Sequence, residues 1–509
     1  MPTGALDGTP NGGVAGAGPS GELGEVQGVL EHLRKRQAES PGFFYAMQVD
    51  GGNRVTGVFW ADARARAAYG SFGDAVTLDT TYQKTRYMPP VAVFQGVNHH
   101  LQGVTLGCCL LMDETKASYL WLLDTWLAAM GGGRRHPGLL VTDQGKTMEA
   151  AVARVMPDTR HRFCQRHILS RCKQKLSEPY AKHATLKADL KECVCGAETI
   201  EEFEAQWECV LNKYNLRENV WLESLYDSRQ QWAWVYQKGF FFPVLLKSQR
   251  SESLNKFFKV HFNAKTPLLV FISRFEEAMA LRLEKEAEAD FATLYLKPNL
   301  KTPSIIERQA ASIYTRAVFE VFQEEFIQSL GYHADKVEDG MILKFIVARQ
   351  EDNGRCHMVT FNQSDKQAKC SCCKFEYAGV PCRHVLRIFF MVWVRSLPEE
   401  YIVKRWTMDA VGSIAPDERS VEPQLSSPES LCAWYNELCE NGLAYAMRGA
   451  MLPDVYKVAK VALQKAFADV VSAKNQQMSE QQSCSRQQDM LQHRMPLPKL
   501  QAKKAPTKK

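Results

Sequence analysis

The sequence predicts an α/β protein, and three observations lead to this fold class. Short segments with strand-like alternation come early in the chain, several of them carry a carboxylate near their end, and amphipathic helical stretches follow. Strands that alternate with helices build a sheet covered by helices. The composition suits a folded chain, because 45% of the 509 residues are hydrophobic and 24% are charged. This length predicts two to four structural units, at roughly 100–200 residues per domain.

The predicted strands come first. Residues 41–50 and 54–62 alternate apolar and polar side chains, as half-buried strands do. Residues 75–83 form a β-rich segment that carries Asp79, and residues 89–113 contain two strands joined by a polar turn. These segments predict one β-sheet.

Helical patterns follow the strands. Residues 118–130 form an amphipathic helix, which three glycines end. Residues 138–143 form a short buried strand with Asp143 at its tip, and another helix starts near Thr147. Residues 165–240 are mostly helical in pattern, so we expect a large helical segment after this strand.

The second half of the chain repeats the mixture of helices and strands. Residues 266–292 form a long helical stretch, and a hairpin begins near Ile342 with its turn at residues 352–354. Residues 428–475 are helical again, and a tail rich in Gln and Lys follows. Such tails lack the apolar residues that a packed core needs, so we expect disorder there.

A cluster of cysteines follows the hairpin directly. Cys370 and Cys372 are one residue apart, as are Cys382 and His384, and a short loop with a Gly and a Pro separates the two pairs. Thiolate and imidazole are the ligands that tetrahedral Zn²⁺ prefers, which predicts a closed structural zinc site. Cys373 is the alternative to Cys372. The other interpretation is a set of core cysteines beside an incidental histidine.

Three carboxylates form a second constellation. Asp79 and Asp143 end apolar strands, where ligands gather in α/β sheets, and Glu252 starts a helical pattern between two serines. Such a triad could bind two divalent ions, Mg²⁺ or Mn²⁺, and assist phosphodiester displacement. An isolated strand-end Asp is, however, more often a cap or turn residue.

A basic segment lies after Asp143. Cys164 and His167 are spaced so that both could meet one metal ion or bond to each other at a helix start. The candidate phosphate contacts are Arg160, Arg162, Arg166 and Arg171. The alternative is a solvated basic helix face.

Charge and hydropathy restrict the other function classes. The net charge of +6 is only mildly basic, so it does not by itself establish nucleic-acid binding. We find no run of 18 apolar residues and expect no membrane partner. The N-terminus lacks the pattern of a signal peptide, so the fifteen cysteines are expected to be reduced. Basic runs at residues 34–36 and 503–509 favour the nucleus.

These pieces occur in an order that resembles a Mutator-like-element (MULE) transposase domain followed by a SWIM zinc finger. More narrowly, the chain is similar to the plant far-red impaired response and far-red elongated hypocotyl family of transposase-derived transcription regulators. The resemblance implies a ribonuclease-H-like core whose acidic positions fall on Asp79, Asp143 and Glu252. Arg166 departs from the family pattern, which has Trp between the Cys and the His of this element.

The resemblance also implies a function. We expect a nuclear zinc-binding transcription regulator acting in light-responsive plant development, with no surviving enzyme activity. The alternative is an active DDE-type transposase that cuts DNA with two divalent ions. The implied partners are DNA, directly or through a family heterodimer, and other transcription regulators, with a homo- or heterodimer as the assembly. Relatives begin with a DNA-binding domain that this chain is expected to lack.

Six segments are expected along the chain. They are a disordered N-terminal segment (1–41), a MULE transposase-like domain (42–265) with its helical insertion at about 165–240, a helical connector (266–340), a SWIM module (341–400), a helical C-terminal region (401–475) and a disordered tail (476–509).

Overall fold

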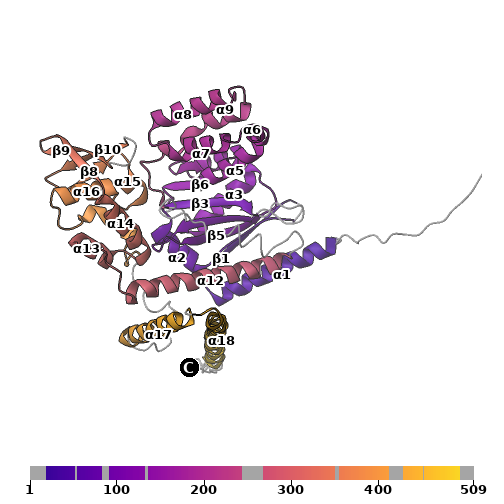
Figure 1. Cartoon of the computed structure of the whole chain (residues 1–509). Coiled ribbons are helices and arrows are strands. Elements are labelled where there is room, and N and C mark those ends of the chain that lie inside the picture. Colours follow the sequence, from indigo (N-terminus) through magenta and orange to yellow (C-terminus); the bar gives the residue numbers. More distant parts are fainter. Residues whose placement is uncertain are drawn as a thin grey trace, which may run out of the picture. The chain divides into compact units, whose positions relative to one another are not determined.

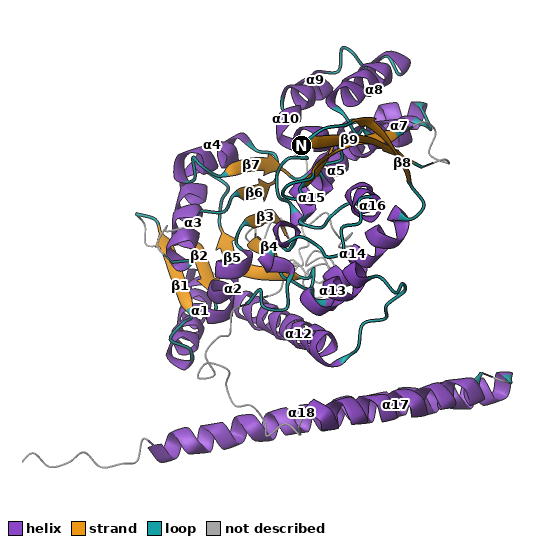
Figure 2. Cartoon of the chain, turned by 90° about the vertical axis from the view of Figure 1, so that its left-hand side faces the viewer, coloured by secondary structure: helices purple, strands orange, loops and turns teal. Residues whose placement is uncertain are grey.

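The computed structural model describes most of the chain in two compact units. The described residues are 19–51, 54–82, 91–131, 136–243, 267–349, 355–411, 428–450 and 452–492. The first unit covers Met1–Ser420 and the second Val421–Lys509. The first unit contains two sheets, each with its own helices (Figures 1 and 2).

A seven-stranded sheet forms the centre of the first unit. Its order is β1-β2-β5-β4-β3-β6-β7. The strands are β1 (Phe44–Val49), β2 (Val55–Ala61), β3 (Ala75–Tyr82), β4 (Val91–Val97), β5 (Gly103–Leu111), β6 (Leu139–Thr142) and β7 (Arg160–Phe163). The pairs β3–β6 and β6–β7 are parallel, and the other pairs are antiparallel. The predicted α/β class is confirmed.

Helices cover both faces of this sheet because the strands alternate their side chains. On one face, α2 (Ala63–Phe72), α3 (Lys116–Ala129) and α4 (Lys146–Val155) close a core around Trp126, which we call the sheet core. On the other face, α1 (Pro19–Glu39) and α12 (Leu268–Tyr295) run side by side (Figure 1).

A helical segment follows β7 and has its own core. Aromatic side chains, among them Phe203, Trp207 and Trp232, fill its centre. Its elements are α5 (Gln165–Lys175), α6 (Ser177–Lys182), α7 (Leu186–Gly196), α8 (Ile200–Lys213), α9 (Val220–Asp227), α10 (Arg229–Trp232) and the 3-10 helix η1 (Trp234–Tyr236).

A four-stranded antiparallel sheet and several helices build another core, which we call the zinc-module core. The sheet order is β11-β10-β9-β8, and the helices pack on it around Phe322, Phe389 and Trp406. The elements are α13 (Ile305–Ile313), α14 (Arg316–Ser329), β8 (His333–Glu338), β9 (Ile342–Ala348), β10 (Cys356–Asn362), β11 (Ala368–Cys370), α15 (Lys374–Ala378), α16 (Arg383–Met391), η3 (Glu399–Tyr401) and η4 (Lys404–Trp406).

The described residues of the second unit form the helices α17 (Pro428–Gly449) and α18 (Pro453–Gln492). The Tyr445 hydroxyl donates a hydrogen bond of 2.7 Å to the carbonyl of Ala459 and ties the helices together. Over the parts of the chain that the structure describes, no helix combines the length and apolarity needed to cross a membrane.

Four boundaries differ from the predictions. Residues 19–39 are helical rather than disordered, because Val29 and Leu33 are buried beside α12. Helix α18 continues past residue 475, where we expected the tail to begin. The connector predicted to be helical (266–340) ends in a strand, β8. Strand β7 was not predicted from the sequence. Both strands carry mostly charged or histidine side chains, which hides the apolar signal of a strand.

Candidate functional site

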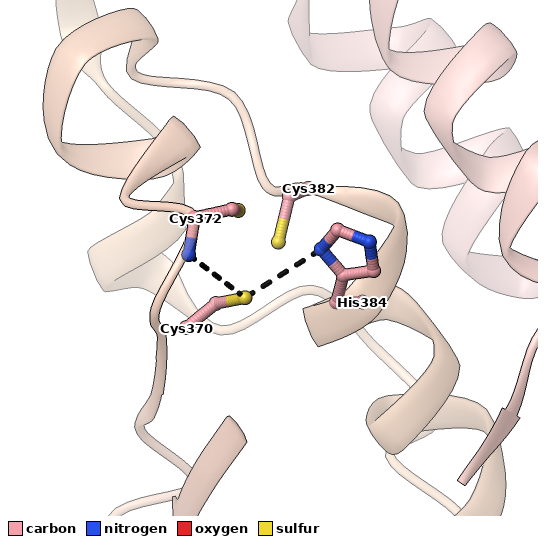
Figure 3. A group of neighbouring side chains, drawn as sticks. All are labelled: Cys370, Cys372, Cys382 and His384. Atoms are coloured by element: carbon pink, nitrogen blue, oxygen red, sulfur yellow. Dashed lines mark hydrogen bonds between the residues drawn. The ribbon is translucent and has the colours of Figure 1, made fainter. Parts of the chain in front are cut away.

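The four predicted zinc ligands lie together. Cys370 ends β11, Cys372 lies in the following turn, Cys382 caps the N-terminus of α16, and His384 lies in its first turn. One ligand atom from each side chain lies within 4.8 Å of all the others. Figure 3 shows the three sulfurs and the imidazole ring converging. The tertiary fold therefore closes the two short ligand pairs into one cluster.

The geometry of this cluster suits a tetrahedral zinc ion. The distance from Cys370 Sγ to His384 Nδ1 is 3.5 Å. Zn–S and Zn–N bonds of ordinary length, at a tetrahedral angle, place these atoms about 3.5 Å apart. Cys370, Cys382 and His384 are all buried, so four protein ligands can close the site to water. The residues present therefore fit structural Zn²⁺.

The electrostatics of the cluster favour a thiolate, which is the form that binds metal. Hydrogen bonds with Cys370 and Cys382 hold the pKa of the Cys372 thiol well below its ordinary value. Backbone N–H groups support the other sulfurs. That of Cys372 donates to Cys370 Sγ at 3.5 Å, and that of Val385 donates to Cys382 Sγ at 3.4 Å.

Backbone conformation selects Cys372 over Cys373. Cys373 has a φ of +54° and precedes α15, and its thiol lies 3.6 Å from the carbonyl of Ser371.

Gly379 ends α15 with a φ of +69°, and a Cβ there would lie 2.7 Å from Trp406 Nε1. Glycine alone adopts that conformation without strain, so the loop that separates the ligand pairs depends on it.

Sequence reasoning missed the acid that supports the zinc helices. Glu325 of α14 is buried and accepts hydrogen bonds from the backbone N–H of Arg383 at 2.8 Å and from its guanidinium at 2.6 and 3.1 Å. Lys374 Nζ lies 2.9 Å away. Burial raises the pKa of Glu325, but the contacts with Arg383 and Lys374 outweigh this effect and lower the pKa to about 2. Glu325 thus joins α15 and α16 as a carboxylate.

The two acids predicted at strand ends also meet, although β3 continues past Asp79 to Tyr82. Asp79 of β3 is buried, Asp143 directly follows β6, and β3 and β6 are parallel neighbours. His167 of α5 joins them, since one ligand atom from each of the three side chains lies within 4.8 Å of the others. His167 Nδ1 contacts Asp143 Oδ1, and its Nε2 lies 3.9 Å from Asp79 Oδ2. Glu252 lies outside the described residues.

The charges around this acidic site are balanced by nearby cations. Burial lowers the pKa of His167, but hydrogen bonds with Asp143 and Cys164 outweigh it and raise the pKa to about 10. Arg166 lies 3.6 Å from Asp79 Oδ2. Cys164 bonds to His167 at the start of α5, which was one of the two predicted roles of this pair.

The four candidate phosphate contacts do not form one basic surface. Arg162 is buried beneath the ring of Phe242, which lies 5.0 Å from its guanidinium, so its prediction as a surface contact is wrong. Burial increases along β7, so that Arg162 and Phe163 at its end are both buried. Arg160 stacks on Phe240 at 3.2 Å, and Arg171 donates to the carbonyl of Gln144 at 2.8 Å. Arg166 is the exposed residue among these four, and its guanidinium lies beside Asp79.

Comparison with known families gives two matches on this chain. A MULE transposase domain matches residues 75–171, a range that contains Asp79, Asp143 and His167. A SWIM zinc finger matches residues 352–392, a range that contains all four cysteine and histidine ligands. The predicted presence of a MULE domain and of a SWIM zinc finger is thereby confirmed.

Curated relatives from Arabidopsis thaliana match most of the chain. Protein FAR1-RELATED SEQUENCE 5 is 40% identical over 457 residues, which cover 89% of this chain and 58% of the relative. Protein FAR1-RELATED SEQUENCE 9 is 38% identical, with 89% and 82% covered. Protein FAR-RED IMPAIRED RESPONSE 1 is 34% identical, with 89% and 54% covered. The chain thus spans little more than half the length of several relatives. On this similarity, together with its MULE and SWIM domains, the chain belongs to the FAR1-related sequence family.

Proposed function

We propose that the chain is a zinc-dependent transcription regulator of the plant nucleus, descended from a transposase and no longer a DNA-cutting enzyme. The similarity to a protein named for an impaired far-red response carries this proposal. That similarity covers 89% of the chain, and so includes both the acidic site and the zinc cluster. A role in light-responsive development follows from the same relative.

The sheet supports descent from a ribonuclease-H-like core. Strands β5-β4-β3 are antiparallel neighbours, and β6 and β7 follow in parallel beside β3. We expect this arrangement for a ribonuclease-H-like core, with Asp79 on β3 and Asp143 directly after the neighbouring strand β6. The proposal takes the helical segment after β7 as the insertion of such a core.

The charges at the acidic site support a regulator rather than a nuclease. Asp143 contacts His167, and Arg166 lies beside Asp79. These cations stabilise the carboxylates as parts of the fold. The convergence of Asp79 and Asp143 also favours a second candidate, a DDE-type transposase, in which the same acids would hold Mg²⁺ or Mn²⁺.

A cleavage assay separates the two candidates. Purified full-length chain is incubated with Mn²⁺ and supercoiled DNA beside the variants Asp79→Ala and Asp143→Ala. We expect no nicking by any of the three proteins. Nicking by the unaltered chain that disappears in both variants would establish the transposase instead, and nicking that persists in the variants indicates a contaminating nuclease.

A reporter assay tests the regulatory role directly. The chain, fused to a fluorescent protein, is expressed in plant cells with a far-red-responsive reporter, alone or with a full-length relative. We expect nuclear fluorescence and a change in reporter output that Cys382→Ser abolishes. DNA binding is measured in the same two combinations, because the proposed contact is direct or through a family heterodimer. Cytoplasmic fluorescence with no reporter change would contradict the proposal.

A further inference from the structure

Two buried histidines occupy the turn between β4 and β5. The Asn98 side chain accepts hydrogen bonds from the backbone N–H groups of His100 at 3.0 Å and Gln102 at 2.9 Å, and Leu101 has a φ of +57°. The rings of His99 and His100 lie 4.0 Å apart, and each residue is only 4% exposed. The turn therefore holds both imidazoles in place before any ligand arrives.

Both imidazoles converge on one carboxylate of helix α12. His100 Nε2 lies 2.8 Å and His99 Nε2 lies 3.6 Å from the same oxygen, Asp290 Oδ1. One ligand atom from each of the three residues lies within 4.8 Å of the others. Nitrogen and oxygen ligands of a tetrahedral zinc ion are about 3.3 Å apart, so the observed distances bracket that value. Very small shifts would therefore admit a metal ion.

We propose that His99, His100 and Asp290 form a second transition-metal site, which fastens α12 to the sheet. Two imidazole nitrogens and a carboxylate oxygen are ligands for a first-row divalent ion, and Zn²⁺ is the appropriate probe. The Asp290 side chain is 50% exposed, so water reaches the fourth position. Both Nδ1 atoms are buried with no hydrogen-bond partner among the described residues, so Nε2 is the nitrogen that each ring turns toward Asp290 and would offer to the ion.

The position of this site sets its role. Strand β4 is antiparallel to β3, with Asp79 opposite Val93, so the turn after Val97 lies at the edge of the sheet where β3 begins and away from Asp79. The carbonyl of His99 accepts a hydrogen bond from Thr315 Oγ1 at 2.5 Å, at the start of α14. The site therefore lies where the sheet, α12 and the zinc-module core meet, and it is separate from the Cys/His cluster.

Metal content of single variants tests the proposal. The full-length chain is loaded with Zn²⁺, freed of loosely bound metal by gel filtration and analysed for zinc. We expect His100→Gln and Asp290→Asn each to hold one equivalent less than the unaltered chain. Glu286→Gln is the matched control, because Glu286 lies one turn before Asp290, bonds to Asn98 at 2.8 Å and is outside the cluster.

The outcomes separate this site from the Cys/His cluster. Cys382→Ser is expected to lose its own equivalent, and the double variant with Asp290→Asn is expected to lose two. With Co²⁺ in place of Zn²⁺, the sulfur-to-metal absorption should persist in Asp290→Asn and disappear in Cys382→Ser. Asp290 is half-exposed, so its variant should fold, as circular dichroism will show. Equal zinc in Asp290→Asn, His100→Gln and Glu286→Gln would overturn the proposal in favour of a metal-free hydrogen-bonded contact.

Discussion

At the scale of single residues, backbone conformation decides which cysteines bind metal. Cys370, Cys372 and Cys373 are near neighbours in the sequence, and all could supply a thiolate. The turn after β11 brings the first two sulfurs to the cluster, whereas the left-handed conformation of Cys373 directs its thiol to the carbonyl of Ser371. Ligand identity thus follows from one φ angle as much as from residue type.

Loss of one zinc ligand should release the metal of the cluster. We expect Cys382→Ser and His384→Ala each to lose about one zinc per chain, because three remaining ligands leave the site open to water. Hydrogen exchange should rise in β10, β11 and α16. Cys373→Ser is the matched control and should keep its zinc. An unchanged zinc content in Cys382→Ser would reject the ligand assignment.

At the scale of elements, a buried carboxylate joins the zinc helices to the rest of their core. Glu325 of α14 is 3% exposed and binds both Arg383 of α16 and Lys374 of α15. Arg383 donates three hydrogen bonds to Glu325. One of them comes from its backbone N–H, which fixes the first turn of α16 beside the ligand His384. The acid therefore positions two ligand-bearing elements without touching the metal.

Removal of the charge on Glu325 should destabilise the zinc module. We expect Glu325→Gln to lower the free energy of unfolding by about 3–5 kcal/mol, because the partly exposed Arg383 and Lys374 then lose their buried counter-charge. Hydrogen exchange of α16 in increasing urea measures this loss. Glu324→Gln is the control, since Glu324 is exposed and accepts a hydrogen bond from Gln328 of its own helix. Equal effects of both variants would show that the ion pairs of Glu325 contribute nothing to the free energy of unfolding.

At the scale of the whole molecule, two hydrophobic cores meet across a buried arginine. Arg405 donates to Asp74 Oδ1 at 2.8 Å and to the carbonyl of Val97 at 3.1 Å, at the edge of the large sheet. Its guanidinium also stacks on Phe241 and Trp406. The sheet core and the zinc-module core thus have separate interiors, and only the second surrounds the Cys/His cluster.

Chelation of zinc should therefore affect the two cores unequally. We expect protection from hydrogen exchange in β9, β10 and α16 to fall by more than about tenfold when a strong chelator removes the metal, since zinc contributes on the order of 10 kcal/mol to small modules. Protection in β3 and α3 should change little, because Val76 and Leu78 of β3 and the buried face of α3 pack in the sheet core. A uniform loss across both cores would contradict this independence.

Short-range patterns carried the predictions that held. The zinc ligands come as two pairs, each separated by a single residue, so local chain geometry already places each pair at one metal. The alternation of strands and helices predicted the α/β class for the same reason, because burial of one face repeats along each element. β7 and β8 were missed since charged and histidine side chains interrupt that repeat.

The amino-acid sequence by itself determined which residue types stand at metal-ligand spacing and that Asp143 follows a buried strand. Only the tertiary structure decided that His167 joins Asp79 and Asp143, that Glu325 supports α16, and that Asp290 meets two histidines 190 positions away. Contacts between distant segments depend on how elements pack, and packing reflects the shape of all buried side chains together. No local pattern contains that information.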